Sequence, residues 1–134
     1  MLVALSIRQP WLELVLQGRK TVEVRSWATK YRGPLVLHAS RKIDLEACSA
    51  YGYDPRELKT GGILGTADLT DCICFTPESW TSSASSHLNL GEFAPGLVGW
   101  TLQAPERLKF VAFWGRLGLF HVPSTLLTES VGAL

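Results

Sequence analysis

The stretch GRKTVEVRSW, residues 18–27, decides the fold, because charged side chains alternate here with residues that favour β-strands. Val22 and Val24 share one face of the predicted strand, and Glu23 and Arg25 share the other. Side chains two residues apart on a strand are separated by about 7 Å at their Cα atoms. We therefore expect Glu23 to pair with Arg25 and to orient its guanidinium. The alternative is a solvated ion pair, which contributes under about 1 kcal/mol.

Lys20 lies just before the same strand, at an even spacing from Val22 and Val24, so regular alternation would place it on their face. A bend or bulge at this point would turn its side chain toward Glu23 and Arg25. There Lys20 would supply a compact cation for a phosphate or an oxyanion, and loss of water would lower its pKa so that it could act as a base. The alternative is a solvated lysine at a strand edge, where lysines are common.

The residues before this stretch predict a strand followed by a short helix. Residues 3–7 form an apolar run, Pro10 suits the first turn of a helix, and residues 11–16 are mostly apolar. Gly18 can take the left-handed conformation that ends a helix. The chain therefore turns at Gly18 and enters the strand that carries the charged residues.

The rest of the chain predicts a mainly β fold with short flanking helices. We expect further strands at residues 35–40, 63–74, 97–103 and 115–122. We also expect a turn at Gly33-Pro34, helices at 44–50 and from Asp54, and a connection at 105–109. Many short strands with few helices favour a small barrel or sandwich over a doubly wound sheet.

The composition predicts a single domain over residues 1–134, since 46% of the residues are apolar and 19% are charged. A net charge of +1 gives no overall attraction to nucleic acid. Such a contact would need a local feature, such as the basic residues 30–32 and 41–42. The apolar start is too short for a membrane segment, and an odd number of cysteines favours a reducing compartment. We expect a cytoplasmic protein without membrane contact.

Cys72 and Cys74 form one candidate metal site, with His38 or Cys48 as a third ligand. Their spacing matches none of the common zinc patterns. Buried apolar packing of the cysteines is therefore the preferred interpretation, and we expect neither a metal nor a cofactor.

Four other side chains are candidates for ligand contact. Gln9 lies at the entry of the first helix, where free N–H groups favour anions. Trp27 lies at a strand end and could stack on a base, with core packing as the alternative. His38 and Ser40 share one face of the strand predicted at 35–40, although a buried histidine bonded to the backbone is the commoner case.

Gly18, Lys20, Glu23 and Arg25 spell G-x-K-x-x-E-x-R, which resembles the signature of the ASCH domain family within the PUA-like superfamily. Neighbouring stretches are similar to this family in kind and order: SIRQPW at 6–11, YRGPLVLHAS at 31–40, GGILGTADL at 61–69 and GRLGLFHV at 115–122. The resemblance covers residues 2–123 and leaves 124–134 as a C-terminal tail.

The resemblance implies a PUA-like β-pseudobarrel with a cleft beside the first helix, into which the motif residues project. It also implies RNA or a nucleotide-like small molecule as the partner, and we expect no DNA. We expect the cleft to be lined by the three motif side chains and by the four candidates above: Lys20, Glu23, Arg25, Gln9, Trp27, His38 and Ser40.

A small hydrolase is the alternative function, because some family members hydrolyse amides on modified cytidine. Lys20 would then be the base or oxyanion stabiliser, with Glu23 or Asp68 as its partner. Glu23 stands where those members carry a threonine, and a carboxylate cannot replace a hydroxyl nucleophile. The same mechanism is therefore not expected here, and an RNA phosphodiester is the other possible substrate.

The polar segment 76–96 contains Trp80 and Phe93. We interpret it either as a surface for protein interaction, with the two aromatic side chains exposed, or as a lid over the cleft.

Overall fold

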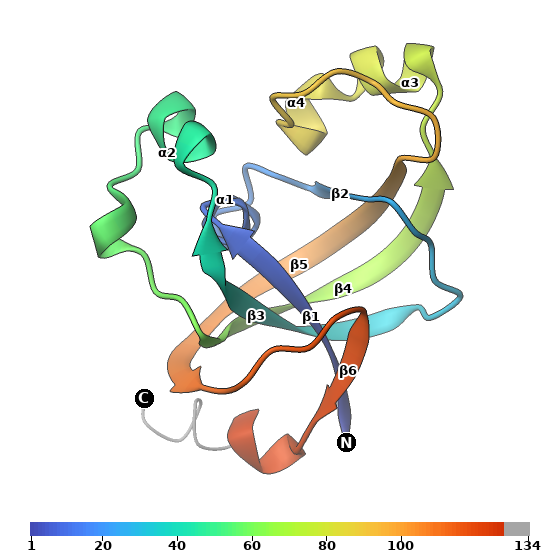
Figure 1. The fold of residues 1–134 in the computed structure, drawn as a ribbon. Helices are drawn as coiled ribbons and strands as arrows, with labels where there is room; N and C mark the ends of the chain where they lie inside the picture. Colours follow the sequence, from blue (N-terminus) through green and yellow to red (C-terminus); the bar gives the residue numbers. More distant parts are fainter. Residues whose placement is uncertain (128–134) are drawn as a thin grey trace.

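The computed structural model describes residues 1–127, and its framework is one six-stranded sheet (Figure 1). The predicted tail at 124–134 therefore lies largely outside the described residues. The strands are β1 (Leu2–Gln9), β2 (Val22–Arg25), β3 (Gly33–Ile43), β4 (Gly62–Cys74), β5 (Val98–Ala112) and β6 (Leu119–Val122). The helices are α1 (Trp11–Leu16), α2 (Leu45–Tyr51), the 3-10 turn Pro55–Glu57, α3 (Pro77–Ser82) and α4 (Ala84–His87).

The strand order is β2-β5-β4-β3-β1-β6, with β1 and β3 parallel and the other neighbours antiparallel. The long strands β4 and β5 curve around the molecule, and α1 lies on the inner side of the curve (Figure 1). β2 and β6 remain as edges, so the sheet bends like a barrel without closing. The prediction of a mainly β fold with short flanking helices is confirmed.

The core fills the inner side of the curved sheet. Leu12, Leu14 and Val15 of α1 are buried against the strands, and Trp100 of β5 is fully buried. The indole N–H of Trp100 donates to the carbonyl of Trp27, at 2.9 Å. This bond connects β5 to the segment that follows β2.

The predicted turn after α1 is confirmed. Gln17 caps the helix, and Gly18 adopts a φ of 77°, in the left-handed region that a side chain would disfavour. The amides of Arg19 and Lys20 both donate to the carbonyl of Leu14. Lys20 is thereby held before the first residue of β2, outside the alternation of that strand.

Three boundaries predicted from the sequence are wrong. The connection expected at 105–109 belongs to β5, which passes Pro105 at a register shift between the pairs Thr66–Glu106 and Asp68–Gln103. Such a bulge tolerates a proline because the ladder does not need its missing N–H. The turn expected at Gly33-Pro34 already pairs with β4. The strand expected from residue 115 begins only at Leu119.

No helix within residues 1–127 is long and apolar enough to cross a bilayer. No group of three or more potential metal-ligating side chains was found in the same residues.

Leu37→Ala tests the position of the core. Leu37 of β3 is 0% exposed, and truncating a buried leucine leaves a cavity that costs about 2–5 kcal/mol of unfolding free energy. Urea denaturation should show this loss, whereas Leu45→Ala on α2, where the side chain is 65% exposed, should change stability by under about 1 kcal/mol. Equal effects of the two substitutions would contradict the described core.

Candidate functional site

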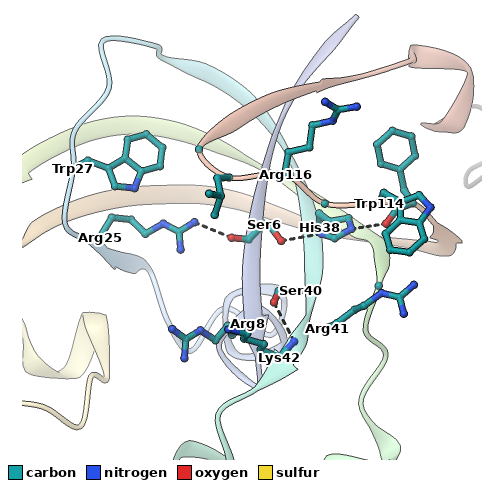
Figure 2. Close-up of a pocket in the computed structure, with 15 residues that line it drawn as sticks. Ser6, Arg8, Arg25, Trp27, His38, Ser40, Arg41, Lys42, Trp114 and Arg116 are labelled. Carbon is teal, nitrogen blue, oxygen red and sulfur yellow. Dashed lines mark hydrogen bonds between the residues drawn. The ribbon is translucent and has the colours of Figure 1, made fainter.

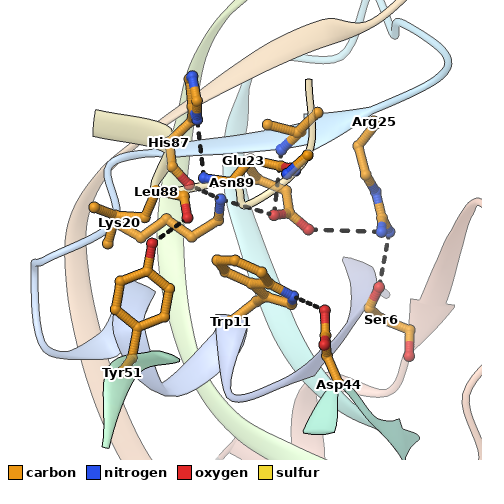
Figure 3. A network of polar contacts seen from close by, with 12 residues as sticks. Ser6, Trp11, Lys20, Glu23, Arg25, Asp44, Tyr51, His87, Leu88 and Asn89 are labelled. Carbon is orange, nitrogen blue, oxygen red and sulfur yellow. Dashed lines mark hydrogen bonds and ion pairs between the residues drawn. The ribbon is translucent and has the colours of Figure 1, made fainter. Parts of the chain in front are cut away.

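The three motif side chains converge on one another, as the sequence predicts (Figure 3). Lys20 Nζ lies 3.6 Å from Glu23 Oε1, and Arg25 Nη1 lies 3.6 Å from Glu23 Oε2. The carboxylate is therefore shared between two cations. Glu23 and Arg25 lie on the same face of β2, and Lys20 reaches them because the turn at Gly18 places it outside the strand.

Lys20 is almost completely enclosed. Its side chain is 1% exposed, its ammonium donates to the carbonyl of His87, and it lies 4.9 Å from the ring centre of Trp11. Burial lowers the pKa of Lys20 below the usual lysine value, and the carboxylate of Glu23 offsets part of that shift. These contacts occupy Lys20 within the protein, which leaves it little room to contact a ligand.

The segment from α3 to residue 91 covers Lys20. The amide of Thr21 donates to the carbonyl of Ser86, and the hydroxyl of Tyr51 donates to that of Leu88. Trp80 stacks on His87, with ring centres 4.1 Å apart. Trp80 is 8% exposed, so the expectation of an exposed Trp80 is wrong: this indole anchors the segment.

The motif lines the smaller of two neighbouring cavities, which has a volume of about 340 Å³. Three cations and three carboxylates contribute to its wall: Arg8, Lys20, Arg25, Glu23, Asp44 and Glu46. The Trp11 indole donates to Asp44, at 3.0 Å, which fixes one of these carboxylates (Figure 3). Because the charges balance, this cavity has no strong preference for an anion.

A larger cavity of about 570 Å³ shares Arg8 and Arg25 with the smaller one (Figure 2). Among the described residues its lining includes five cations and no carboxylate: Arg8, Arg25, Arg41, Lys42 and Arg116. Trp27, His38 and Ser40, three of the expected ligand residues, also line it, together with Ser6 and residues 113–118.

Arg25 connects the two cavities, because it lines both. Its Nη2 donates to the carbonyl of Ser6 on β1, at 2.7 Å, so the guanidinium lies between the edge strand β2 and β1. Arg25 Nε is buried and has no hydrogen-bond partner within residues 1–127. A buried N–H without a partner is uncommon in a folded protein.

Two expected residues lie outside both cavities. Gln9 is 0% exposed, donates to the carbonyl of Lys59 and accepts from the amide of Glu13. Its side chain therefore connects α1 to the segment that precedes β4. Asp68 is exposed on β4, opposite Pro34 and Gln103, and is not among the residues that line the two cavities.

The sequence reasoning missed Trp114 and Arg116. It placed residues from 115 onward in a strand, whereas residues 113–118 form a loop that borders the larger cavity. The two glycines in GRLG, at 115 and 118, were the available signal for a loop.

Lys20→Met tests the internal role of the motif lysine. Removing one partner of a buried ion pair costs about 3–5 kcal/mol, and here it also leaves the carbonyl of His87 without its donor. Hydrogen–deuterium exchange should therefore accelerate in residues 83–91, and thermal stability should fall. Lys30→Met, at an exposed lysine, is the control. Unchanged exchange in both variants would show that Lys20 does not hold this segment.

Comparison with known proteins places this geometry in a family. A family model described as the ASCH domain matches residues 5–109. Activating signal cointegrator 1 of Homo sapiens and that of Mus musculus are each 38% identical to this chain over 81 residues. The match covers 52% of this chain and 14% of each relative, so the chain corresponds to a small part of their length.

Among solved structures, ASCH from Zymomonas mobilis matches with a TM-score of 0.69 and 12% identity, over 98% of this chain and 94% of that one. A mutant of the same protein matches with a TM-score of 0.68. At this identity the likeness shows the fold alone. Since the family model spans most of the sequence, the chain belongs to the ASCH domain family.

Proposed function

We propose that this ASCH domain binds single-stranded RNA or a nucleotide, with a phosphate in the larger cavity. One observation carries the proposal: five cations and no carboxylate from the described residues line a hollow of about 570 Å³. The net charge of the chain is only +1, so this concentration of positive charge is local. Charges of one sign inside a concave wall focus the field and attract an oppositely charged ligand.

The cations come from four separate segments, which suits an extended polyanion. Arg8 lies on β1, Arg25 on β2, Arg41 and Lys42 on β3, and Arg116 on the loop at 113–118. Arginine forks bind phosphate oxygens in pairs. Arg25 is the best-positioned of these side chains, because Glu23 and the carbonyl of Ser6 fix its orientation at the wall of the cavity.

Two indoles border the same cavity and offer surfaces for bases. Trp114 is 76% exposed, and the guanidinium of Arg41 lies 4.6 Å from its ring centre. Trp27 is half-buried and packs edge to face against Trp100, with ring centres 4.7 Å apart. Stacking of a base on an aromatic ring contributes about 1–3 kcal/mol and depends little on sequence.

The geometry favours binding over hydrolysis by Lys20. Lys20 contacts Glu23 and His87 and is buried, and Asp68 lies on a different part of the sheet. In this proposal Glu23 acts mainly by orienting Arg25, and it could also accept a hydrogen bond from a base amino group in the smaller cavity.

The first test measures binding of a short fluorescein-labelled oligouridylate by fluorescence anisotropy over a range of salt concentrations. Arg116→Ala should weaken binding and reduce the slope of log K against log salt by about 1, because each lost phosphate contact releases about one counterion fewer. Arg56→Ala is the control, since Arg56 pairs with Asp54 away from both cavities. Equal affinity and slope in wild type and Arg116→Ala would contradict the placement of phosphate in this cavity.

A second test replaces the exposed indole. Trp114→Ala should weaken binding about 5- to 150-fold through lost stacking, with an unchanged salt slope, because no charge is removed. Trp114→Phe should retain most of the affinity. If both substitutions leave the anisotropy titration unchanged, the bases do not stack on this residue.

A further inference from the structure

Ser6 and His38 face each other within the larger cavity (Figure 2). They are direct partners in the parallel register of β1 and β3, and Ser6 Oγ lies 2.9 Å from His38 Nδ1. The other ring nitrogen, Nε2, lies 2.7 Å from the carbonyl oxygen of Phe113. Neither residue belongs to the G-x-K-x-x-E-x-R motif.

The partner of Nε2 determines the direction of both hydrogen bonds. The carbonyl of Phe113 can only accept, so Nε2 carries the proton of the neutral imidazole. Nδ1 is then the unprotonated nitrogen, and it accepts from the hydroxyl of Ser6. A hydroxyl that donates to a histidine, with that histidine oriented by a third group, is the arrangement of an activated serine nucleophile.

We propose that Ser6 is a nucleophile activated by His38, and that the larger cavity hydrolyses carboxylic esters of anionic compounds. This activity goes beyond RNA binding. The preference for an anionic ester rests on the proposed function, because the same cations would hold the negative charge of the substrate. The serine–histidine chemistry itself stands on the geometry of the two side chains.

The reaction proceeds in two balanced steps. Ser6 Oγ attacks the ester carbonyl carbon while His38 Nδ1 takes the hydroxyl proton. The intermediate then expels the alkoxide, which receives that proton, and the acyl group remains on Ser6. Water attacks the acyl-serine, His38 takes a proton from the water and returns it to Ser6 Oγ, and the carboxylic acid leaves. No oxidant, reductant or further reactant is needed.

The surroundings of His38 suit the role of a general base. His38 is 2% exposed, and its ring packs edge to face against Phe120, with ring centres 5.8 Å apart. Burial lowers the pKa of His38 below the usual histidine value, and the bond to Phe113 opposes that shift. The neutral base is therefore the main form at neutral pH.

The partner of Nε2 also favours esters over amides. A carbonyl dipole stabilises the imidazolium formed during attack less strongly than a carboxylate would, because it carries no full charge. Esters are the easier substrates, because an ester carbonyl is less stabilised by resonance than an amide carbonyl and because the nitrogen of an amide must be protonated before it can leave. A serine–histidine pair without a carboxylate partner therefore suits ester hydrolysis better than amide hydrolysis.

Arg25 contacts the backbone of Ser6 and places a fixed positive charge near the developing oxyanion. Its Nη2 is held on the carbonyl of Ser6, and its buried Nε has no partner within residues 1–127. A fixed cation that needs no reorganisation during the reaction is an effective form of transition-state stabilisation.

Gly115 explains how the loop at 113–118 approaches the dyad without filling the site. A Cβ at this position would lie 2.6 Å from His38 Cε1 and 3.2 Å from Ser6 Oγ. Only glycine leaves this space beside the two reacting atoms. The loop also supplies the Phe113 carbonyl, so it both orients the base and borders the substrate.

The decisive experiment treats the full chain with diisopropyl fluorophosphate and locates the modified residue by peptide mass spectrometry. We expect modification at Ser6, and its loss or slowing by about 10²–10⁴-fold in His38→Gln. His121→Gln on β6 and Ser49→Ala on α2, both at exposed positions, are the matched controls and should react as wild type does. Absence of modification at Ser6 in the folded wild-type protein overturns the proposal.

Turnover is measured with two p-nitrophenyl esters, the neutral acetate and the anionic hemisuccinate. We expect a higher kcat/KM for the hemisuccinate, and loss of activity with both esters in Ser6→Ala, which removes a single oxygen atom. Circular dichroism and urea denaturation confirm that the variant is folded. Turnover that persists in folded Ser6→Ala overturns the assignment of the nucleophile.

Gly115→Ala provides a second variant that leaves both dyad side chains in place. It should reduce both fluorophosphate modification and ester turnover, because the added methyl group meets His38. The outcomes separate the two proposals. RNA binding without modification of Ser6 overturns this inference alone, whereas modification and turnover without RNA binding overturn the proposed function alone.

Discussion

The carboxylate of Glu23 lies between two cations, and the arrangement of the site depends on that contact. Lys20 approaches one oxygen and Arg25 the other, both at 3.6 Å. Each cation then contacts a backbone carbonyl, Lys20 that of His87 and Arg25 that of Ser6. One buried acid therefore couples the edge strand β2 to the covering segment on one side and to β1 on the other. A buried carboxylate without these partners would be strongly unfavourable, since charge is costly to remove from water.

This contact also explains how the motif relates to the larger cavity. Lys20 and Glu23 pair with each other, and Lys20 also donates to a backbone carbonyl, so these two residues organise the site more than they attract a ligand. The positive charge of the larger cavity comes from other segments, including Arg41, Lys42 and Arg116. Arg25 belongs to both groups, because it is oriented by the motif and lines both cavities. The ion pair with Glu23 therefore fixes the orientation of a guanidinium that lines the cavity in which we place the phosphate.

Much of the fold could be predicted from local patterns, and the errors have identifiable causes. The helix at 11–16, its end at Gly18 and the alternation of Glu23 with Arg25 follow from short-range geometry and are confirmed. Pro105 predicts a connection, since proline usually interrupts a ladder, but the register shift between β4 and β5 accommodates it. Trp80 lies in a polar segment that predicts exposure, yet it stacks on His87 in the folded chain. The family resemblance, based on the motif and the order of the strands, is confirmed by the match over 5–109.

The amino-acid sequence by itself determined the approximate position of the strands, the helix that precedes the motif and the shared face of Glu23 and Arg25. These depend on periods of two and 3.6 residues and on where glycine permits a turn. Only the tertiary structure decided that Ser6 lies opposite His38, thirty-two positions along the chain, and that Gly115 of the loop at 113–118 lies beside both. Side-chain periodicity carries no information about which distant strands pair or in what register. The pairing and register of the strands are set by the burial of the whole core, and they bring together the residues that line the larger cavity.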